Sequence, residues 1–372
     1  MPGKSILILG ASARAAAFSA ARADLAPHWI DRYGDSDLRE RFPGCSLDAA
    51  HYPQGLIAAA RDVPDMPFLI TGAMENHLDV LEVLGAERRL LGNDAGICRA
   101  VRDPAAVYAC LSRAGLPAPA VSVRAPGGGN WVRKPLHSAG GKDVSHCGGD
   151  AAAGAGEYLQ EYIEGRSLSA VFVADGRNAR LAGVTRQLVG KAAFHAGRFV
   201  YCGSLGPLLL TASEERQWGD IGLALAETFH LRGLFGVDAV QRGESIYPVE
   251  INPRYTASVE VVEAGTGAAL LAQHVRACGG EPIPPAAARR GVHGKCHLFA
   301  PERLIVQTDL LTLPMPCEMD AVTLADVPAP GTVIAAGHPV MTLLVEGCDQ
   351  LECLRRLTEA APAILKRVMG EV

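Results

Sequence analysis

Short apolar runs alternate with helical periodicity at the start of the chain, and this alternation constrains the fold more than any other feature. Residues 5–9 (SILIL) have the pattern of a buried strand, and Gly10 separates them from an alanine-rich helix. Residues 67–72 (PFLITG) form a second such strand, followed by the helical segment ENHLDVLEVLG. Strands that alternate with helices predict a parallel, doubly wound sheet of the α/β class. We expect this first unit to end near residue 92.

The rest of the chain has a different pattern, with more β-structure and more glycine. A helix is expected after Asp103-Pro104, because proline is favoured in a first helical turn. Glycine-rich turns between short strands fill residues 127–156, and a helix is predicted over 213–232. GLFGVDAVQRG and ESIYPVEINP then form a predicted hairpin, and a proline-rich linker occupies 281–291. The remainder is expected to be a small, mostly β unit closed by a C-terminal helix.

Charge and hydropathy exclude several classes of function. The chain has 372 residues and a formal net charge of −5, so nothing favours nucleic acid or an anionic membrane as a partner. No apolar run reaches the roughly 18 residues of a membrane-spanning helix, and the N-terminus is better explained by a core strand than by a signal peptide. We therefore expect a cytoplasmic protein. None of the ten cysteines forms a Cys-x-x-Cys pair, which argues against a zinc site.

The turn Gly10-Ala11-Ser12-Ala13-Arg14 is the first candidate for ligand binding. A glycine between a first strand and a helix can admit a phosphate at the helix N-terminus. The dinucleotide signature G-x-G-x-x-G lacks its second and third glycines here, and Asp31 alone is weak support for a ribose contact. A tight turn beside a cleft, with Ser12 or Arg14 near an anionic group, is favoured over nicotinamide binding.

The second candidate is Lys134 in the strand WVRKP, which precedes the glycine-rich segment SAGG at 138–141. A strand lysine can direct a compact charge at a phosphate, and glycines let backbone N–H groups approach phosphate oxygens closely. The lysine precedes the glycines, so this is not a Walker loop. A hairpin turn with a solvated lysine explains the segment equally well.

The third candidate is the pair of acids in the predicted hairpin, Asp238 and Glu250, together with Asn252. A hairpin places its two strands side by side, and residues two apart on a strand share a face. Carboxylate and amide oxygens on one face suit a hard cation such as Mg²⁺. The alternative is a polar sheet face or a structural salt bridge. Acids inside such apolar strands (LFGVDAV, IYPVEI) favour the metal site, because burial without a partner is costly.

Taken together, the lysine-proline with its glycine loop, the segment QEYIEG, and D … EINPR in this order resemble the ATP-grasp superfamily, over about residues 5–285. The resemblance implies an α/β (α+β) fold that holds ATP between two lobes, with an ADP-forming transfer of an acyl phosphate to a nucleophile. It implies a Rossmann-like pre-ATP-grasp domain at 1–92, an ATP-grasp domain at 93–285 with a lid at about 120–180, and a C-terminal β-rich unit at 286–372. That last unit resembles the tail of biotin carboxylase relatives.

The same resemblance implies roles for individual residues. Mg²⁺ or Mn²⁺ would be held by Asp238, Glu250 and Asn252, while Arg254 and Arg186 would act in catalysis. In these families a hinge strand reads adenine through backbone groups, and a strand lysine and a glycine loop hold the phosphates. The positions that match these ATP contacts are Lys134, Ser138, Gly140, Gly141, Gln160, Glu161, Tyr162, Ile163 and Ser167.

Three positions depart from the pattern of these families. Pro104 stands where many relatives have a phosphate-binding lysine, and Arg99 or Arg102 could replace it. Ser167 stands where a ribose-binding glutamate is usual, and Gly236-Val237 precede the first metal acid where some ligases have an arginine. The lost positive charge could come from Arg186 or from two further residues, Lys191 and Arg198.

The order TGAMENH, EINPR and a helix with Glu260 and Glu263 resembles predicted carboligases linked to methanopterin- and methanofuran-type one-carbon cofactors. This implies small-molecule carboxylate and amine substrates, such as an amino acid joined during cofactor biosynthesis, and leaves a homodimer open. Glu75 and Asn76 could face the acceptor, although a carboxylate at a helix N-terminus explains Glu75 equally well. A bicarbonate-dependent carboxylase and a non-catalytic ATP-binding regulator remain alternatives.

Overall fold

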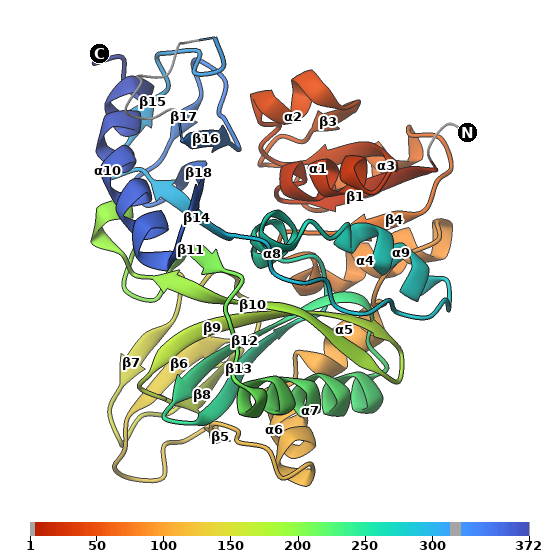
Figure 1. Ribbon diagram of the computed structural model, residues 1–372, viewed down its shortest axis with the longest axis vertical. Helices are drawn as coiled ribbons and strands as arrows, with labels where there is room; N and C mark the ends of the chain where they lie inside the picture. The colour runs from red at the N-terminus through yellow and green to blue at the C-terminus, as the bar shows by residue number, and fades with distance from the viewer. Residues whose placement is uncertain (1–3, 313–320, 372) are drawn as a thin grey trace.

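Four parallel strands begin the fold in the computed structural model, which describes residues 4–312 and 321–371 (Figure 1). Their order is β3-β2-β1-β4, with bounds Gly44–Ser46, Ala26–Asp31, Ser5–Gly10 and Phe68–Ile70. Ile6 to Leu9 are at most 1% exposed, as expected for a strand covered on both faces. The predicted parallel α/β unit is therefore confirmed.

A long, mixed-length antiparallel sheet of eight strands occupies the centre of the molecule. Its order is β13-β12-β9-β10-β11-β14-β18-β16. The first five have bounds Ser245–Asn252, Arg232–Arg242, Arg166–Asp175, Ala179–Val189 and Tyr201–Gly206, and the last three Val292–Phe299, Pro339–Gly347 and Val322–Ala325. β12 and β13 form the predicted hairpin, with a register shift between Asp238 and Ala239. Because β14 pairs with β11, the sheet continues across residue 285, where we placed a domain boundary.

Two smaller sheets complete the β-structure. One has the order β5-β8-β6-β7, with bounds Val121–Ser122, Glu157–Glu161, Trp131–Pro135 and Ser145–Cys147. The other pairs β15 (Leu304–Ile305) with β17 (Val333–Ile334). In Figure 1 the β5–β8 sheet lies beside β12 and β13 of the central sheet, so that two lobes face each other at this end of the molecule.

Helices pack against the parallel N-terminal sheet and the central sheet, and one helix covers the C-terminal end of the molecule. α7, Ala212–Phe229, packs against β9 and β10, and α8, Ala257–Thr266, lies between α1 and strands β10, β11 and β14. The other α-helices are α1 Arg14–Arg22, α2 Ser36–Arg41, α3 Gly55–Arg61, α4 Leu78–Glu87, α5 Ala95–Val101, α6 Pro104–Arg113, α9 Leu270–Cys278 and α10 Gln350–Val368, and the 3₁₀ turns are η1 Met74–Asn76 and η2 Ala192–Phe194. The helix expected over 213–232 ends earlier, because His230 adopts a left-handed conformation (φ 56°) and β12 begins at Arg232.

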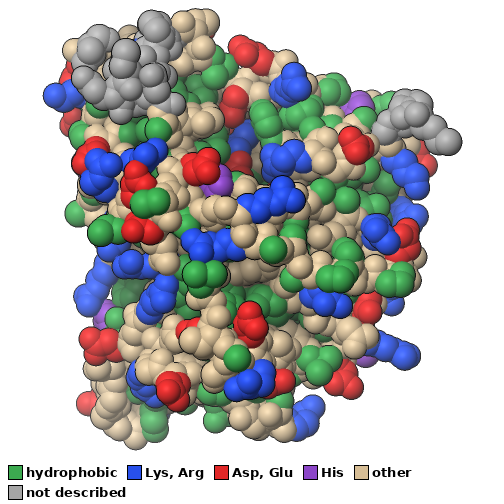
Figure 2. Space-filling view, viewed as in Figure 1, with side chains coloured by type: hydrophobic (Ala, Val, Ile, Leu, Met, Phe, Trp, Pro, Cys, Tyr) green, Lys and Arg blue, Asp and Glu red, His purple; other side chains and the backbone are tan. Residues whose placement is uncertain are grey.

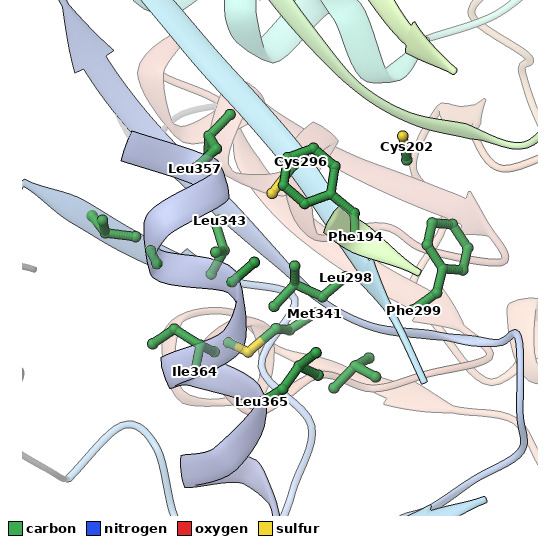
Figure 3. Close-up of a cluster of buried hydrophobic side chains, with 14 of the residues drawn as sticks. Phe194, Cys202, Cys296, Leu298, Phe299, Met341, Leu343, Leu357, Ile364 and Leu365 are labelled. Carbon is green, nitrogen blue, oxygen red and sulfur yellow. The ribbon is translucent and has the colours of Figure 1, made fainter. Parts of the chain in front are cut away.

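The C-terminal helix is amphipathic and covers the end of the central sheet. Figure 3 shows Leu357, Ile364 and Leu365 of α10 facing Leu298, Met341 and Leu343 of β14 and β18, in a cluster of buried apolar side chains. Burial of a leucine or isoleucine side chain is worth about 1.5–3 kcal/mol, so this packing attaches α10 firmly to the sheet. The expected C-terminal helix is present, and it packs on strands β14 and β18 of the central sheet.

The surface and the thiols agree with an ordinary globular chain. Basic and acidic side chains are both spread over the face shown in Figure 2. Among residues 4–312 and 321–371, no helix is both long and apolar enough to cross a membrane. The nine cysteines in these ranges are free thiols, and Cys317 lies outside them.

Candidate active site

The acids of the hairpin stand side by side. Asp238 of β12 pairs directly with Glu250 of β13, and Gly236 pairs with Asn252. The side chains of Asp238 and Asn252 meet, with Asn252 Nδ2 donating to Asp238 Oδ2 at 3.3 Å. As the alternation along the strands predicts, three side chains with oxygen atoms lie on one face of the sheet.

Asp238 lies in an environment that disfavours its charge. Burial, and then the neighbouring carboxylate of Glu250, raise the pKa of Asp238 to about 6. Hydrogen bonds from Ser169 and Gln187 act in the opposite direction and orient the group. A buried carboxylate thus stands beside the half-buried carboxylate of Glu250, and a divalent cation would relieve the repulsion between them.

The donor set fits a magnesium ion. Mg²⁺ takes oxygen ligands, and one or two carboxylates together with substrate phosphates are its usual partners. Asp238 and Glu250 offer carboxylates, and Asn252 offers Oδ1, which accepts from Arg254 Nη2 at 3.2 Å. In the described ranges no cluster of three or more His, Cys, Asp or Glu side chains has a metal-binding arrangement, so two acids and an amide would hold the ion with the help of the substrate.

Arg254 is held in place by a residue from the N-terminal sheet. Glu75, in η1 after β4, is 2% exposed and accepts from Arg254 Nε at 2.7 Å. Although burial favours the neutral acid, Arg254 and then Arg102 lower the pKa of Glu75, so the carboxylate stays charged. Glu75 therefore contacts Arg254 and orients it, whereas we had considered an acceptor contact or a helix-terminal role for it.

Arg102 joins three parts of the site. Its Nη1 donates to Glu250 Oε1 at 2.9 Å, and its Nη2 donates to Asn76 Oδ1 at 2.9 Å. The same nitrogen is 3.2 Å from Leu136 O and 3.3 Å from Ser138 O, at the start of the glycine-rich segment. Arg102, at the end of α5, thus brings a positive charge next to the metal face. Arg99, the other residue we had considered, is 62% exposed and pairs with Glu82.

Lys134 faces the same cleft from the opposite lobe. Two adjoining pockets between the lobes share the lining residues Lys134, Gly141, Val144, Val249 and Glu250. Lys134 Nζ donates to Val249 O at 3.2 Å, which uses one of the three donors of an ammonium group. Burial lowers the pKa of Lys134, while Glu250 and Asp238 oppose that shift. An anionic ligand in this cleft would therefore stabilise the charged lysine.

The glycine-rich segment closes one side of the cleft. Gly140 and Gly141 have φ of 68° and 77°, and a Cβ on Gly141 would lie 2.0 Å from Phe199 O. Tyr201 N donates to Gly140 O at 3.0 Å, and Asn76 Nδ2 donates to Ser138 O at 3.0 Å. Only glycine fits at position 141, so the segment brings bare backbone to the cleft.

The proposed hinge residues divide between the two faces of their strand. Gln160 shares a face with Lys134 because their strands pair with period two, and it lines the cleft. Glu161 pairs with Trp131 on the other face, and its Oε2 accepts from Ala120 N at 3.2 Å. Ile163 is buried, and the Tyr162 ring contacts His146 at a centroid distance of 4.5 Å. Glu161, Tyr162 and Ile163 do not line the two pockets between the lobes. Ser167 on β9 lines one of them.

The structure does not bring Arg186 into this group. Thr185 of β10 pairs with Ser169, whose side chain bonds Asp238, so Thr185 and Gln187 point to the cleft face. Arg186 points to the opposite face, where it lies near Arg166. Burial lowers the pKa of Arg166, and the positive charge of Arg186 lowers it further. Lys191 follows β10, and Arg198 is exposed, with its guanidinium 5.6 Å from the Phe199 ring centroid.

The turn after β1 has structural partners. Asp31 is fully buried and accepts from Ala13 N at 3.0 Å and Gly34 N at 2.8 Å, so it holds two loops together. Arg14 pairs with Glu260 and, at 3.0 Å, with Asp326. Glu263 of the same helix as Glu260 pairs with Arg22 and accepts from Ser19 Oγ at 2.7 Å.

Several residues that line the cleft were not predicted from the sequence. Gln187 and Ser169 orient Asp238, while Tyr201 and Thr256 line the cleft beside Arg254. Polar residues in apolar strands were a usable signal for Ser169 and Gln187. Without the register of β9 and β10, however, that signal could not choose between Gln187 and its neighbour Arg186.

Comparison with known proteins finds a domain match and several relatives of the chain. A family model described as an ATP-grasp domain matches residues 101–258. The chain is 26% identical to the uncharacterised protein MJ0776 of Methanocaldococcus jannaschii over 187 residues, which is 50% of this chain and 42% of that protein. It is 30% identical over 127 residues to the carbamoyl phosphate synthase large chain of Bifidobacterium animalis, a match of 34% of this chain and 11% of the relative. The chain thus spans less than half the length of these relatives.

Solved structures resemble the chain over almost its whole length. Biotin carboxylase from Campylobacter jejuni has a TM-score of 0.73 at 16% identity and covers 96% of this chain and 90% of its own. N5-carboxyaminoimidazole ribonucleotide synthetase from Thermotoga maritima has a TM-score of 0.70 at 14% identity, with 96% and 98% covered. At these identities the likeness concerns the fold. Residues 101–258 therefore match an ATP-grasp domain, and the fold of the whole chain resembles the folds of these two solved structures.

Proposed function

We propose that this chain is an ATP-dependent, ADP-forming ligase that activates a carboxylate as an acyl phosphate and joins it to an amine. The observation that carries the proposal is the cleft itself. Asp238, Glu250 and Asn252 lie on one wall, with Lys134 and the glycine-rich segment on the other. A triphosphate with its metal ion matches that distribution of acids, cation and bare backbone.

Each side chain then has a role that follows from its position. Mg²⁺ bound to Asp238, Glu250 and Asn252 would neutralise negative charge on the phosphates. Lys134 would bind phosphate oxygens from the other lobe, and the backbone of Gly140 and Gly141 would approach them without hindrance from a Cβ.

Two arginines complete this assignment. Arg254, oriented by Glu75, would offer a fork of donors to the charge that develops during phosphoryl and acyl transfer. Arg102 would take the place of the lysine that is absent at Pro104, because it already reaches Glu250 and the start of the glycine-rich segment. In this assignment, catalysis depends mainly on positioning and on charge neutralisation.

The finer proposal concerns the substrates. The resemblance of TGAMENH and EINPR to carboligases of one-carbon metabolism supports an amino-acid ligase, for example one that joins glutamate to an amine during cofactor biosynthesis. A screen that measures ADP and phosphate release tests both levels of the proposal, with carboxylates and amines supplied singly and in pairs. ADP release that needs one carboxylate and one amine together supports the ligase, and release that needs no amine contradicts it.

A bicarbonate-dependent carboxylase is the second candidate. Its support is the whole-chain fold similarity to a biotin carboxylase, which covers 96% of this chain. That activity would appear in the same screen as ATP turnover that requires bicarbonate in the absence of any added amine. A chain that binds ATP with Mg²⁺ and releases no phosphate with any pair would instead be a regulatory nucleotide-binding protein.

A further inference from the structure

A second pocket lies between the carboxyl edge of the N-terminal sheet and strands β14 and β18. Ser12, which follows β1, and Tyr33 and Asp35, which follow β2, line one side of it. His297, Phe299 and Asp326 line the other side. In an open α/β sheet, ligands bind outside the carboxyl ends of the strands, near the point where the strand order reverses. The pocket lies at the carboxyl ends of β1 and β2, so it is on the edge of the sheet where a ligand is expected.

Asp35 is the most unusual residue of this pocket. It is 7% exposed, and its carboxylate has no hydrogen-bond or ion-pair partner among the residues that the structure describes. It precedes α2 at the N-cap position, but its side chain caps no backbone N–H there. Burial, followed by the nearby acids Asp326 and Asp31, raises the pKa of Asp35 well above its usual range. A buried carboxylate without a partner destabilises the fold. A ligand that pairs with Asp35 would offset this cost and explain why the acid is present.

Two cations close to the pocket, Arg14 and Lys295, are already bonded to other acids. Arg14 bonds Glu260 and Asp326, and its Nε is 3.9 Å from Asp37 Oδ2. Lys295 Nζ donates to Glu260 Oε2 at 2.8 Å. Asp37, Asp326 and Glu260 therefore share two positive charges, and Asp35 adds a further negative charge that has no ion-pair partner of its own. This excess of acid predicts that the missing group is a cation.

The remaining walls of the pocket are apolar. Phe299 and Met341 line it, with Pro339 and Val340 beside them and the ring of Tyr33 near its mouth. A bare metal ion or a small hydrated cation would leave these walls against water. A molecule with an ammonium group and an apolar body satisfies both parts, because its cation meets Asp35 while its body covers the walls.

The pocket adjoins the cleft of the proposed ligase. The His297 ring packs edge-on against Tyr201 at a centroid distance of 5.7 Å, and Tyr201 lines the cleft beside Arg254. Tyr201 and Ser204 are joined by a 2.8 Å hydrogen bond, and Ser204 Oγ is 3.5 Å from Ser258 Oγ, another lining residue of the cleft. Resting on the proposed function, we propose that this pocket binds the amine substrate, as a small molecule with a primary ammonium group and an apolar body, held by Asp35.

The test is a calorimetric titration of the full chain, without ATP, at neutral pH. The probes are 2-phenylethylamine and hexylamine, the neutral counterpart 2-phenylethanol, and phenylalanine, which carries a carboxylate beside its ammonium group. We expect the amines to bind at least tenfold more tightly than the alcohol and the amino acid, because the carboxylate of phenylalanine would meet Asp35 and Asp326. An amino-acid substrate would be indicated if phenylalanine bound most tightly, and this would overturn the proposal.

The variant Asp35→Asn keeps the shape of the side chain and removes its charge. We expect it to lose at least tenfold in affinity for the amines and to unfold at a temperature equal to or above that of the parent chain, because no partner is lost. Glu40→Gln, on the exposed side of α2, is the matched control and should change neither quantity. Two results would overturn the proposal. One is equal amine binding by Asp35→Asn and the parent chain. The other is no binding of either amine up to about 10 mM, which is roughly the weakest affinity of a useful substrate site.

A separate titration with ATP and Mg²⁺ distinguishes this result from a failure of the proposed function. Asp35 lies outside the nucleotide cleft, so Asp35→Asn should bind the nucleotide as the parent chain does. Amine binding that depends on Asp35 in a chain that binds no ATP would leave the pocket assignment standing and contradict the ligase. The reverse result would contradict the pocket assignment alone.

Discussion

Two buried clusters of charge lie close together in this protein, and they differ in how their charges are balanced. Glu260 has two cations in contact, because Arg14 and Lys295 are both bonded to its carboxylate. Around Asp238, a second acid stands directly alongside on the neighbouring strand, and the nearest arginines bond Glu250 and Asn252 instead. The pKa values follow this difference, because that of Glu260 is lowered to about 2 and that of Asp238 is raised to about 6.

The contrast separates structural charge from functional charge. A paired group stabilises the fold only while its partner is present, and loss of one partner leaves an uncompensated charge. An acid that lacks compensation costs stability in the free protein and gains it when a cation binds. Substitutions in the Glu260 cluster should therefore act on stability, and substitutions in the Asp238 cluster should act on ligand binding and turnover.

The largest effect is expected for Glu250→Gln. Removal of one carboxylate from the metal face should lower ADP formation by about a thousandfold, since metal-ion stabilisation of a transition state is worth several kcal/mol. The substitution keeps an acceptor for Arg102, so the fold should persist. Steady-state ADP release with the substrate pair from the screen is the measurement, and near-normal turnover would remove Glu250 from the metal site.

The next effect is expected for Arg14→Met. Three carboxylates, those of Glu260, Asp326 and Asp37, would lose a shared partner, and breaking a buried pair costs about 3–5 kcal/mol. Thermal and urea unfolding measure the loss. Arg61→Met is the control, because its pair with Glu87 is exposed to solvent and contributes little to stability. Similar losses in both variants would show that the Arg14 cluster is no more important than a surface pair.

Lys134→Ala should weaken ATP binding by about 10- to 100-fold, the equivalent of a hydrogen bond to a charged group at about 1.5–3 kcal/mol. Lys4→Ala, which removes an exposed lysine far along the chain from the cleft, serves as the control. The measurement is an ATP titration with Mg²⁺ present. Unchanged affinity in Lys134→Ala would contradict a phosphate contact for this lysine.

Glu260 should make the stability of the protein depend on pH. Burial alone would raise its pKa, but Arg14 and then Lys295 outweigh burial and lower it to about 2. Because the folded-state pKa lies below the unfolded value, the stabilisation is present above about pH 4.5 and is lost as the pH falls toward 2. Glu260→Gln should unfold at a lower temperature than the parent chain at pH 7, and the gap should narrow below pH 4.5. A gap that is constant over this range would contradict the pairing.

The smallest effect is expected for Asp238→Asn in the absence of nucleotide and metal. The substitution removes a carboxylate that burial and Glu250 disfavour, so the unfolding temperature at pH 7 should equal or slightly exceed that of the parent chain. The same variant should lose the stabilisation that Mg²⁺ and ATP give to the parent chain. A markedly lower unfolding temperature without ligands would assign Asp238 a structural role.

The sequence predicted the parts of the site that depend on local geometry. Asp238, Glu250 and Asn252 could be grouped because a hairpin and a period of two are enough to place them on one face. Arg186 could not be placed, since its orientation depends on the register of β10 against β9. Nor could the support of Arg254 be foreseen, because Glu75 comes from a turn of a different sheet, 179 positions away in the chain.

The central claim is that Asp238 and Glu250 complete a site for ATP with its metal ion. It is tested most directly by titrating ATP into the full chain with and without Mg²⁺, and repeating both titrations with Glu250→Gln. We predict that Mg²⁺ tightens ATP binding to the parent chain at least tenfold and has little effect on the variant. ATP binding that is independent of Mg²⁺ in the parent chain, or an equal Mg²⁺ effect in both proteins, would contradict the account.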